Sequence, residues 1–434
     1  MSYAAIDLGA SSGRVVVGRF DGATMQLEEL HRFANRPVRL PDGLRWNLLH
    51  LFEEALSALR GKTFKGVGVD TWGVDYALLD EHHRVLGLPF HYRDSRTDGA
   101  EPLDHAYGIT GIQHMPINTV FQLLVDDRVG EAERIALVPD LLAYWLGGEL
   151  ANERTNASTT GLMDATTGNW SGPLLTRLGL PLRPFRDLVE PGTELGRARE
   201  FDAPIYTVAS HDTASAFVAA PIGADSAILS SGTWSLLGVE LDHPVFSDPA
   251  LTNERGVDGT IRLLKNVMGL WLEQECARVW RVDYPTLHAE AAAAKKHVEF
   301  DVDDERFLRG GNMPALIQQV TGILTRGELV RSIYVSLARR YAAVLERLEA
   351  VSGRAVNTIH VIGGGARNTL LCQLTADITG RAVLAGPVEA TALGNVLVQA
   401  RAAGELSSLA EMRAVSAASF APVSYQPSKE LSHA

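Results

Sequence analysis

Residues 4–17, AAIDLGASSGRVVV, and residues 227–241, AILSSGTWSLLGVEL, share one pattern: an apolar strand, a turn of Gly, Ser and Thr, and a second strand. Such a turn presents successive backbone N–H groups and hydroxyls to one small space, which suits a phosphate group. One copy alone would mean little. Because a copy opens each half of the chain, the sequence predicts a duplicated fold with a nucleotide held between its halves.

The length of 434 residues exceeds that of one typical domain and suits two. On composition, the best boundary is the turn cluster PIGAD at residues 221–225, directly before the second copy of the motif. We therefore expect one domain over residues 1–221 and another over residues 222–434.

The composition is typical of a soluble globular protein, with 46% hydrophobic and 21% charged residues. No apolar run approaches the ~20 residues of a membrane span, and no signal segment precedes the first strand. Two cysteines in unrelated contexts, Cys276 and Cys372, favour a reducing cytoplasm. A formal net charge of −12 without a basic block argues against nucleic-acid binding. We expect a cytoplasmic protein without a membrane or nucleic-acid partner, and the sequence sets no oligomeric state.

Hydrophobic periodicity predicts the elements around these motifs. Apolar residues at helical spacing predict helices over residues 47–60 and 328–350. Strand-forming residues predict a strand over residues 25–38 and a hairpin that joins residues 76–79 to residues 85–89. Strands and helices that alternate in this way indicate an α/β fold.

A third glycine-rich loop lies in the second half of the chain. A predicted strand over residues 358–362 runs into GGGARN at residues 363–368, and a helix follows over residues 370–378. This arrangement places the amides at a helix N-terminus against an anion. The spacing matches neither a Walker A loop nor a dinucleotide fingerprint, so the sequence indicates an anion site of another kind.

Four carboxylates follow or end predicted strands, at Asp7, Asp70, Asp75 and Asp212. Ligands of α/β sheets sit beyond the carboxyl ends of strands. Phosphoryl transfer needs one carboxylate for Mg²⁺ and another that accepts the proton of the attacking hydroxyl. We assign the proton acceptor to Asp212, which precedes a small-residue helix. We assign the metal to Asp7, which lies next to the first turn.

Each assignment has a structural alternative. Asp212 could simply cap a helix that begins at Ala214. Asp7 could close its turn with a hydrogen bond. A lone histidine such as His211 is more often structural than catalytic. Two phosphate-suited turns and a triple-glycine loop in the same chain favour the functional interpretation of Asp7 and Asp212.

The duplicated motif resembles the actin/hexokinase/Hsp70 superfamily of ATPases. The loop at residues 363–368 is similar to the C-terminal signature of the FGGY carbohydrate kinases, as are the residues that follow it: Gln373, Ala376, Asp377, Thr379, Gly380, Glu389, Ala390, Ala392, Leu393 and Gly394. The resemblance implies an α/β fold with two ribonuclease H-like (actin-like ATPase) domains and a central cleft. It further implies that residues 1–221 bind sugar and phosphate and that residues 222–434 bind the nucleotide.

Six further motifs resemble the members of this family that phosphorylate the ketose L-rhamnulose: DTWGVD at 70–75, YRDSRTDG at 92–99, SHDTAS at 210–215, SSGTWSL at 230–236, LKNVMGLW at 264–271 and AGPVEA at 385–390. The similarity covers residues 5–404, and residues 285–330 and the tail after Ser407 match least. It implies transfer of the γ-phosphate of ATP to the 1-hydroxyl of L-rhamnulose, a step of L-rhamnose catabolism.

The resemblance also assigns residues to roles. The ATP-binding residues would be Ala10, Ser11, Ser12, Gly13, Arg14, Thr233, Gln274 and Gly364. The sugar-binding residues would be Gly73, His211, Asp212, Thr213 and Asn266, with Asp212 as the proton acceptor. The wider superfamily implies Mg²⁺ at Asp7.

Two alternatives stay open at this point. Members of the family also act on other ketoses, so L-fuculose or D-xylulose could be the substrate. A non-catalytic member of the superfamily would instead use ATP as a conformational switch. A chaperone of that kind would need a peptide-binding module, and the sequence after Gly404 offers little room for one.

Overall fold

A computed structural model describes residues 2–223 and 225–428. The described chain forms two compact units. Unit 1 comprises the described residues of Met1–Pro221, Glu240–Leu263 and Ala390–Ser419, and unit 2 those of Ile222–Val239, Leu264–Glu389 and Phe420–Ala434. The chain first changes unit at the predicted turn cluster, but unit 1 also contains two later segments. The division into domains 1–221 and 222–434 therefore stays a prediction.

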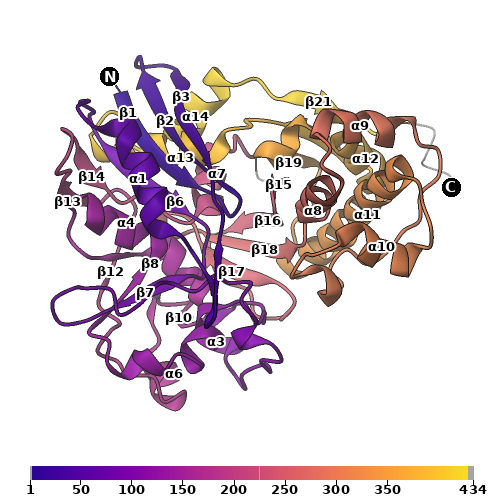
Figure 1. Cartoon of the computed structure of the whole chain (residues 1–434). Helices are drawn as coiled ribbons and strands as arrows, with labels where there is room; N and C mark the ends of the chain where they lie inside the picture. Colours follow the sequence, from indigo (N-terminus) through magenta and orange to yellow (C-terminus); the bar gives the residue numbers. More distant parts are fainter. Residues whose placement is uncertain (1, 224, 429–434) are drawn as a thin grey trace. The chain divides into compact units, whose positions relative to one another are not determined.

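Unit 1 is built on a six-stranded sheet with the strand order β13-β14-β6-β1-β2-β3 (Figure 1). Its strands are β1 (Ser2–Leu8), β2 (Ser12–Phe20), β3 (Met25–Ala34), β6 (Val67–Thr71), β13 (Glu194–Arg197) and β14 (Pro204–Tyr206). β1 pairs antiparallel with β2 and parallel with β6. The carboxyl ends of β1 and β6 therefore lie at one edge, where Asp7 is opposite Asp70.

The second sheet repeats this arrangement, with the strand order β17-β18-β16-β15-β19-β20-β21. Its strands are β15 (Ser226–Ser231), β16 (Ser235–Leu241), β17 (Thr252–Arg255), β18 (Ile261–Val267), β19 (Thr358–Ile362), β20 (Ala382–Ala385) and β21 (Val423–Tyr425). β15 pairs antiparallel with β16 and parallel with β19, as β1 does with β2 and β6. The two predicted glycine-rich turns are thus the two hairpin turns of a repeated strand pattern.

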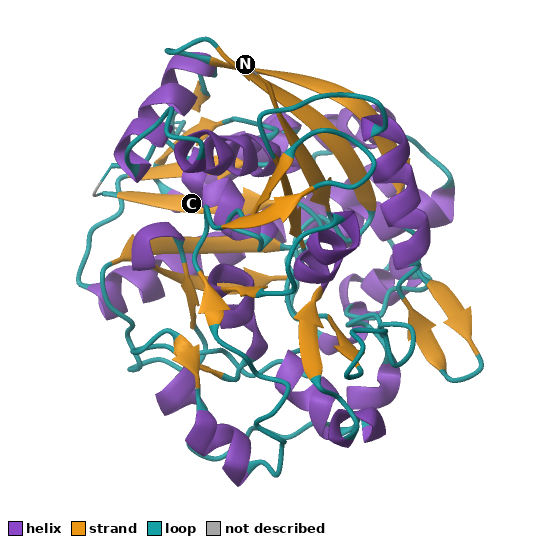
Figure 2. Ribbon diagram, turned by 90° about the vertical axis from the view of Figure 1, so that its left-hand side faces the viewer, coloured by secondary structure: helices purple, strands orange, loops and turns teal. Residues whose placement is uncertain are grey.

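Both units contain helices and strands, which Figure 2 distinguishes by colour. The helices of unit 1 are α1 (Leu48–Leu59), α2 (Tyr107–Thr110), α3 (Thr119–Leu124), α4 (Val138–Leu146), α5 (Arg154–Ala157), α6 (Gly172–Arg177), α7 (Asp212–Ala219), α13 (Ala390–Ala402) and α14 (Leu409–Ser419). The helices of unit 2 are α8 (Trp271–Trp280), α9 (Tyr284–Ala293), α10 (Met313–Thr321), α11 (Arg326–Ser352) and α12 (Thr369–Thr379), which lie together in Figure 1.

The predicted helices are confirmed. The helix expected over residues 47–60 is α1, and the helix expected over residues 328–350 is α11. α11 begins with a capping box, in which the Thr325 side chain accepts from the Glu328 amide and Glu328 bonds back to Thr325. It ends at Gly353, which has φ of +68°.

Two strand predictions are wrong in part. The strand expected over residues 25–38 ends at Ala34, because Pro37 has no N–H for the ladder, and Val38 begins a separate short hairpin. The hairpin between residues 76–79 and 85–89 is reduced to one bridge, Leu79 to Val85, and one bond from the Leu86 amide to the Leu78 carbonyl. Strand β7 (Tyr76–Leu79) pairs instead with β8 (Arg134–Leu137).

Small two-stranded sheets complete unit 1. They pair β4 (Val38–Leu40) with β5 (Gly43–Arg45), β7 with β8, β9 (Asn152–Glu153) with β12 (Leu188–Val189), and β10 (Met163–Asp164) with β11 (Asn169–Trp170). Within the described residues, no helix combines the length and apolar character needed to cross a membrane. Cys276 and Cys372 are both buried and free.

Candidate active site

Asp212 is the first residue of helix α7 in unit 1. The segment before it is tied to β6, because the Thr71 amide donates to the Ser210 carbonyl at 2.9 Å and Thr71 forms a bridge with His211. The Asp212 side chain is 28% exposed, whereas that of His211 is 8% exposed. Asp212 therefore remains accessible at the start of a helix whose other residues are buried.

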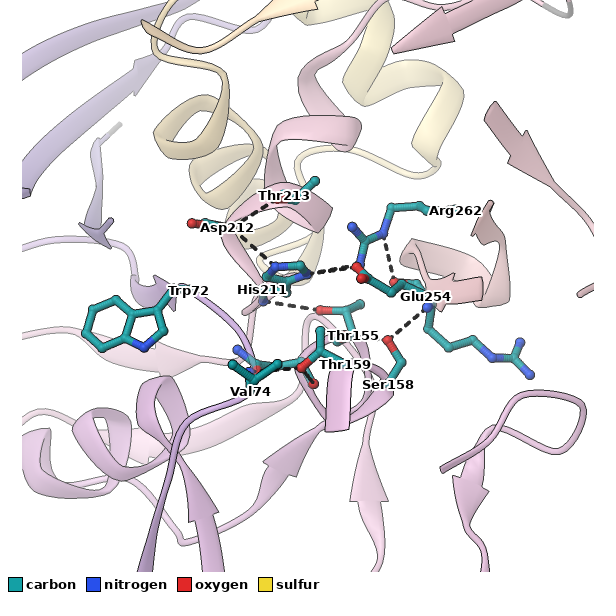
Figure 3. Close-up of polar contacts among 12 residues, drawn as sticks. Trp72, Val74, Thr155, Ser158, Thr159, His211, Asp212, Thr213, Glu254 and Arg262 are labelled. Carbon is teal, nitrogen blue, oxygen red and sulfur yellow. Dashed lines mark hydrogen bonds and ion pairs between the residues drawn. The ribbon is translucent and has the colours of Figure 1, made fainter. Parts of the chain in front are cut away.

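The carboxylate of Asp212 is oriented by its two neighbours in the chain (Figure 3). Its Oδ1 accepts from the Thr213 hydroxyl at 3.1 Å and lies 3.4 Å from Nε2 of His211. His211, not Asp212, occupies the N-cap position of α7, and no side-chain cap is formed there. The alternative in which Asp212 caps a helix from Ala214 is therefore wrong. A carboxylate in the first turn is also favoured by the helix dipole.

Burial raises the pKa of Asp212 above its ordinary value, and the charge of Asp7 raises it further. His211 and the hydrogen bond from Thr213 oppose this shift. A carboxylate with a raised pKa binds a proton more readily than a free aspartate, which is the property that a general base needs.

His211 belongs to a buried polar network that the sequence did not indicate (Figure 3). Its Nδ1 lies 3.2 Å from Oε2 of Glu254, on β17, and Glu254 forms an ion pair at 3.0 Å with Arg262, on β18. Glu153 fixes the backbone before His211, because its Oε2 accepts from the Ser210 amide at 3.0 Å and the Ser210 hydroxyl at 2.6 Å. Glu254, Arg262 and Glu153 lie 43–58 positions along the chain from Ser210 or His211, so no local pattern could mark them.

The pKa values of the buried carboxylates in this network move in opposite directions. Burial raises the pKa of Glu254, but the charges of Arg262 and His211 outweigh burial and leave it below its ordinary value. Burial also raises the pKa of Glu153, and in that case the hydrogen bonds from Ser210 and Thr155 compensate only in part. Glu254 is therefore held as an anion beside Arg262.

Asp7 and Arg14 face each other across the first hairpin. They are register partners, and Arg14 binds Oδ2 of Asp7 through Nε at 2.8 Å and Nη2 at 2.6 Å. Asp70, on the neighbouring strand, is fully buried, and its Oδ2 accepts from the Asn395 amide at 2.6 Å. Burial and the charge of Asp7 raise the pKa of Asp70 well above its ordinary value. The structure thus joins the predicted metal residue to a predicted phosphate residue.

Asp75, the fourth strand-end carboxylate, is a structural anchor. Its Oδ2 accepts from the indole N–H groups of Trp46 at 2.5 Å and Trp72 at 3.0 Å, and its Oδ1 accepts from Gln122 at 2.9 Å. Burial raises the pKa of Asp75 to about 6, against the effect of these donors. The rings of Trp46 and Trp72 stack with centroids 3.8 Å apart.

Gly73 lies in the turn after β6, beside η3 (Ser158–Thr160). A Cβ at Gly73 would come within 2.9 Å of the Thr159 hydroxyl, and the Val74 amide donates to that hydroxyl at 3.1 Å. Thr159 therefore holds this turn in place (Figure 3). A direct contact of Gly73 with a sugar stays a prediction.

Unit 2 brings together three of the predicted ATP-binding positions. The Thr233 hydroxyl, in the second hairpin turn, donates to Oε1 of Gln274 at 3.1 Å. The triple-glycine loop packs on the same hairpin, because a Cβ at Gly365 would overlap the Ser231 side chain. Gly364 has no atom near the position of a Cβ, so it faces open space. Asn266 lies on β18 in unit 2, and its sugar contact stays a prediction.

The first hairpin turn is closed by the Gly9 amide, which donates to the Ser12 carbonyl at 2.9 Å. The remaining predicted phosphate residues, Ala10, Ser11 and Gly13, lie in or directly beside this turn. Gly13 is required there because a Cβ would overlap the ring of Phe33. Within residues 2–223 and 225–428, no group of three or more His, Cys, Asp or Glu side chains is arranged to hold a metal.

The chain matches two family models. Residues 2–204 match the N-terminal domain of the FGGY family of carbohydrate kinases, and residues 227–403 match its C-terminal domain. The chain therefore belongs to the FGGY family of carbohydrate kinases, enzymes that transfer a phosphoryl group to a sugar.

Two similar relatives within the family are both rhamnulokinases. The chain is 42% identical to a rhamnulokinase of Bacillus subtilis (strain 168), over 97% of this chain and 94% of that protein. It is 43% identical to a rhamnulokinase of Enterococcus faecalis (strain ATCC 700802 / V583), over 98% of this chain and 94% of that protein.

Solved structures confirm the predicted fold class. A ligand-bound xylulose kinase from Lactobacillus acidophilus has a TM-score of 0.79 at 14% identity, covering 98% of this chain and 94% of that one. A glycerol kinase from Plasmodium falciparum with ADP has a TM-score of 0.76 at 15% identity, with the same coverage. At these identities the likeness establishes the α/β actin-like kinase fold alone.

Proposed function

We propose that this chain transfers the γ-phosphoryl group of ATP to the 1-hydroxyl of L-rhamnulose, giving L-rhamnulose 1-phosphate and ADP. The observation that carries the proposal is the geometry of Asp212. Its accessible carboxylate starts α7, has a raised pKa and is oriented by His211 and Thr213. The choice of sugar is supported by rhamnulokinase relatives that are 39–43% identical over nearly the whole chain.

In the proposed reaction, Asp212 accepts the proton of the 1-hydroxyl as that oxygen attacks the γ-phosphorus. His211 and Thr213 flank the base, where they can direct hydrogen bonds to the hydroxyls of a ketose. Arg14 of the first turn and Thr233 of the second would contact the ATP phosphates, and Gln274 and Gly364 would complete the nucleotide pocket. The domain of residues 1–221 would bind the sugar and phosphate, and the domain of residues 222–434 would bind the nucleotide.

Mg²⁺ that accompanies ATP would neutralise charge on the β- and γ-phosphates. We assign it to Asp7, and the donor chemistry fits. Asp70 lies beside Asp7 in register, and its Oδ1 is buried without a hydrogen-bond partner. Mg²⁺ prefers oxygen ligands and commonly takes only one or two carboxylates from the protein. We also propose a cytoplasmic location, in keeping with two free, buried cysteines.

The experiment that tests this function measures ADP release from ATP with a panel of ketoses: L-rhamnulose, L-fuculose, D-xylulose and D-fructose. We expect the highest kcat/KM with L-rhamnulose. Highest efficiency with another ketose would retain the kinase mechanism and reassign the sugar. ATP turnover that ignores every sugar would contradict the proposal and favour the ATP-switch alternative.

Replacement of Gly364 by valine should raise the KM for ATP at least ~10-fold, which corresponds to ~1.4 kcal/mol. The added side chain would project into space that is open in this structure, so the fold should be retained. Thermal unfolding checks retention of the fold, and steady-state kinetics gives KM. As a comparison, Gly365→Val should instead destabilise unit 2, because its side chain would overlap Ser231. An unchanged KM for ATP in a folded Gly364→Val protein would remove Gly364 from the nucleotide pocket.

The pH dependence of kcat/KM should show an acid limb above the pKa of a free aspartate, ~3.9. The base must be ionised to accept a proton, and burial raises the pKa of Asp212. Activity should therefore be lost as pH falls through the raised pKa and be retained above it. The measurement is kcat/KM for the ketose between pH 4 and 8, with stability monitored at each pH. A constant kcat/KM down to pH 4 in folded protein would contradict the role of Asp212.

A further inference from the structure

Glu254 and Arg262 form a buried ion pair in unit 1, beside His211. The Arg262 side chain is 0% exposed and that of Glu254 is 6% exposed, and Nη2 of Arg262 lies 3.0 Å from Oε2 of Glu254. Desolvation of two charges is costly, so an apolar pair of similar size would often stabilise a protein as well or better. Stability alone therefore gives a poor account of these two charges.

The pair faces one edge of the His211 ring (Figure 3). Oε2 of Glu254 and Nη2 of Arg262 both lie 3.2 Å from Nδ1 of His211. The opposite ring nitrogen, Nε2, is thereby left facing Oδ1 of Asp212 at 3.4 Å. The hydrogen bond from Thr213 goes to the same Oδ1. Figure 3 shows the other carboxylate oxygen of Asp212 pointing away from His211 and Thr213, and we assign the contact with the substrate hydroxyl to this oxygen.

We propose that Glu254 and Arg262 are positioning residues for the reaction: they fix the His211 ring, and through it the carboxylate of Asp212. This inference rests on the proposed function, in which Asp212 is the base. Neither residue touches the reacting atoms. Their role resembles that of outer carboxylates that fix the orientation and tautomer of a histidine by holding its second nitrogen.

The backbone of this segment is held separately, which isolates the effect of the pair. The Glu153 carboxylate accepts hydrogen bonds from the backbone amide and the hydroxyl of Ser210, directly before His211. It also accepts hydrogen bonds from the backbone amide and the hydroxyl of Thr155. Removal of the Glu254 carboxylate should therefore leave the chain path intact and release only the imidazole ring. A small displacement of a reacting group can lower a rate ~10²-fold.

The first variant is Glu254→Gln. We expect kcat with the ketose to fall about 10–100-fold, while KM for ATP changes less than about 2-fold. The variant also leaves Arg262 without a counter-charge, so thermal stability should fall. A matched control is Glu349→Gln, which removes a partly buried glutamate that pairs with Arg381 in unit 2. The control should keep the wild-type kcat.

The second variant, Glu254→Gln with Arg262→Met, separates positioning from stability. It removes both charges and leaves no unpaired ion in the core, so the melting temperature should recover most of the loss seen in Glu254→Gln. A positioning role predicts that kcat stays low in this double variant. Recovery of kcat together with stability would overturn the proposal and leave the pair a purely structural role.

A double-mutant cycle tests whether the pair acts through His211. In a His211→Asn background, Glu254→Gln should change kcat less than about 2-fold, because the ring that it positions is absent. The same loss in both backgrounds would overturn the proposal.

Nitrogen NMR of the His211 ring gives a readout independent of activity. Its Nδ1 resonance should shift in Glu254→Gln and not in Glu349→Gln, and an unshifted resonance would also count against the proposal. If the wild-type protein phosphorylated none of the ketoses, that result would instead contradict the proposed function.

Discussion

Asp212→Asn should lower kcat by about 10²–10⁴-fold, the range typical for loss of a general base. Asparagine has nearly the shape of aspartate and can still receive the Thr213 hydroxyl, which in the native protein lies 3.1 Å from Oδ1. It cannot accept the proton of the attacking hydroxyl. ATP binding should be largely retained, because Asp212 is not among the proposed ATP-binding residues and three of those, Thr233, Gln274 and Gly364, belong to unit 2.

The measurement is ADP release at saturating ATP and ketose, together with the affinity for ATP by titration calorimetry. A suitable control is Asp202→Asn in unit 1, whose side chain is 63% exposed and pairs only with Arg197 at the surface among the contacts described. The control should keep kcat within about 2-fold, since exposed ion pairs contribute little. If Asp212→Asn turned over at close to the wild-type rate, another group would have to accept the proton.

Local patterns in the sequence suffice for the elements that carry Asp212 and the two hairpin turns. Each hairpin joins strands that are adjacent in the chain, and a glycine-rich turn between apolar strands marks it directly. Helices α1 and α11 are long enough for their apolar period to be unambiguous. Asp212 was identifiable because it follows a strand and precedes a run of small residues.

Local patterns in the sequence do not predict which distant strands pair with each other. The sequence around Tyr76–Leu79 favours a hairpin with its neighbour, yet the strand pairs with Arg134–Leu137, more than 50 residues away. The neighbouring segment, residues 85–89, does not form a regular partner strand, because Gly87 has φ of +146° and Pro89 lacks an N–H. Only the tertiary structure selects the actual partner.

Glu254 and Arg262 show the same limit at the site. In the sequence they are two charged residues outside the quoted motifs, and charged residues are mostly solvent-exposed. Their burial, and their contact with His211, follow from the packing of β17 and β18 beside the segment before α7. A residue that acts through another residue is not marked by any fixed spacing in the sequence.

Gly394 is a further residue whose role only the structure explains. It lies inside helix α13, where glycine is intrinsically unfavourable by ~1 kcal/mol relative to alanine. A Cβ at this position would overlap the carbonyl oxygen and carbon of Ser215, in helix α7 of the same unit. The close approach of the two helices therefore requires the absence of a side chain at Gly394.

Gly394→Ala should destabilise the protein by about 3 kcal/mol, at the upper end of the range for overpacked cores, despite the gain in helix propensity. The obstacle is the backbone of α7, which cannot rotate away as a side chain could. Next to Gly394, Asn395 donates to Asp70 at 2.6 Å, so displacement of α13 would also disturb the end of β6. Because α7 begins at Asp212, kcat of the remaining folded protein should fall as well.

The measurement is urea unfolding of wild type, Gly394→Ala and the control Gly108→Ala. Gly108 is exposed in α2, has no atom near the position of a Cβ and should tolerate alanine with a change of about 0.5–1 kcal/mol in the stabilising direction. Opposite signs for the same chemical change would attribute the loss at Gly394 to the α7 backbone. If Gly394→Ala were as stable as wild type, α7 and α13 must be able to separate, and α13 could not be the element that fixes the start of the base-bearing helix.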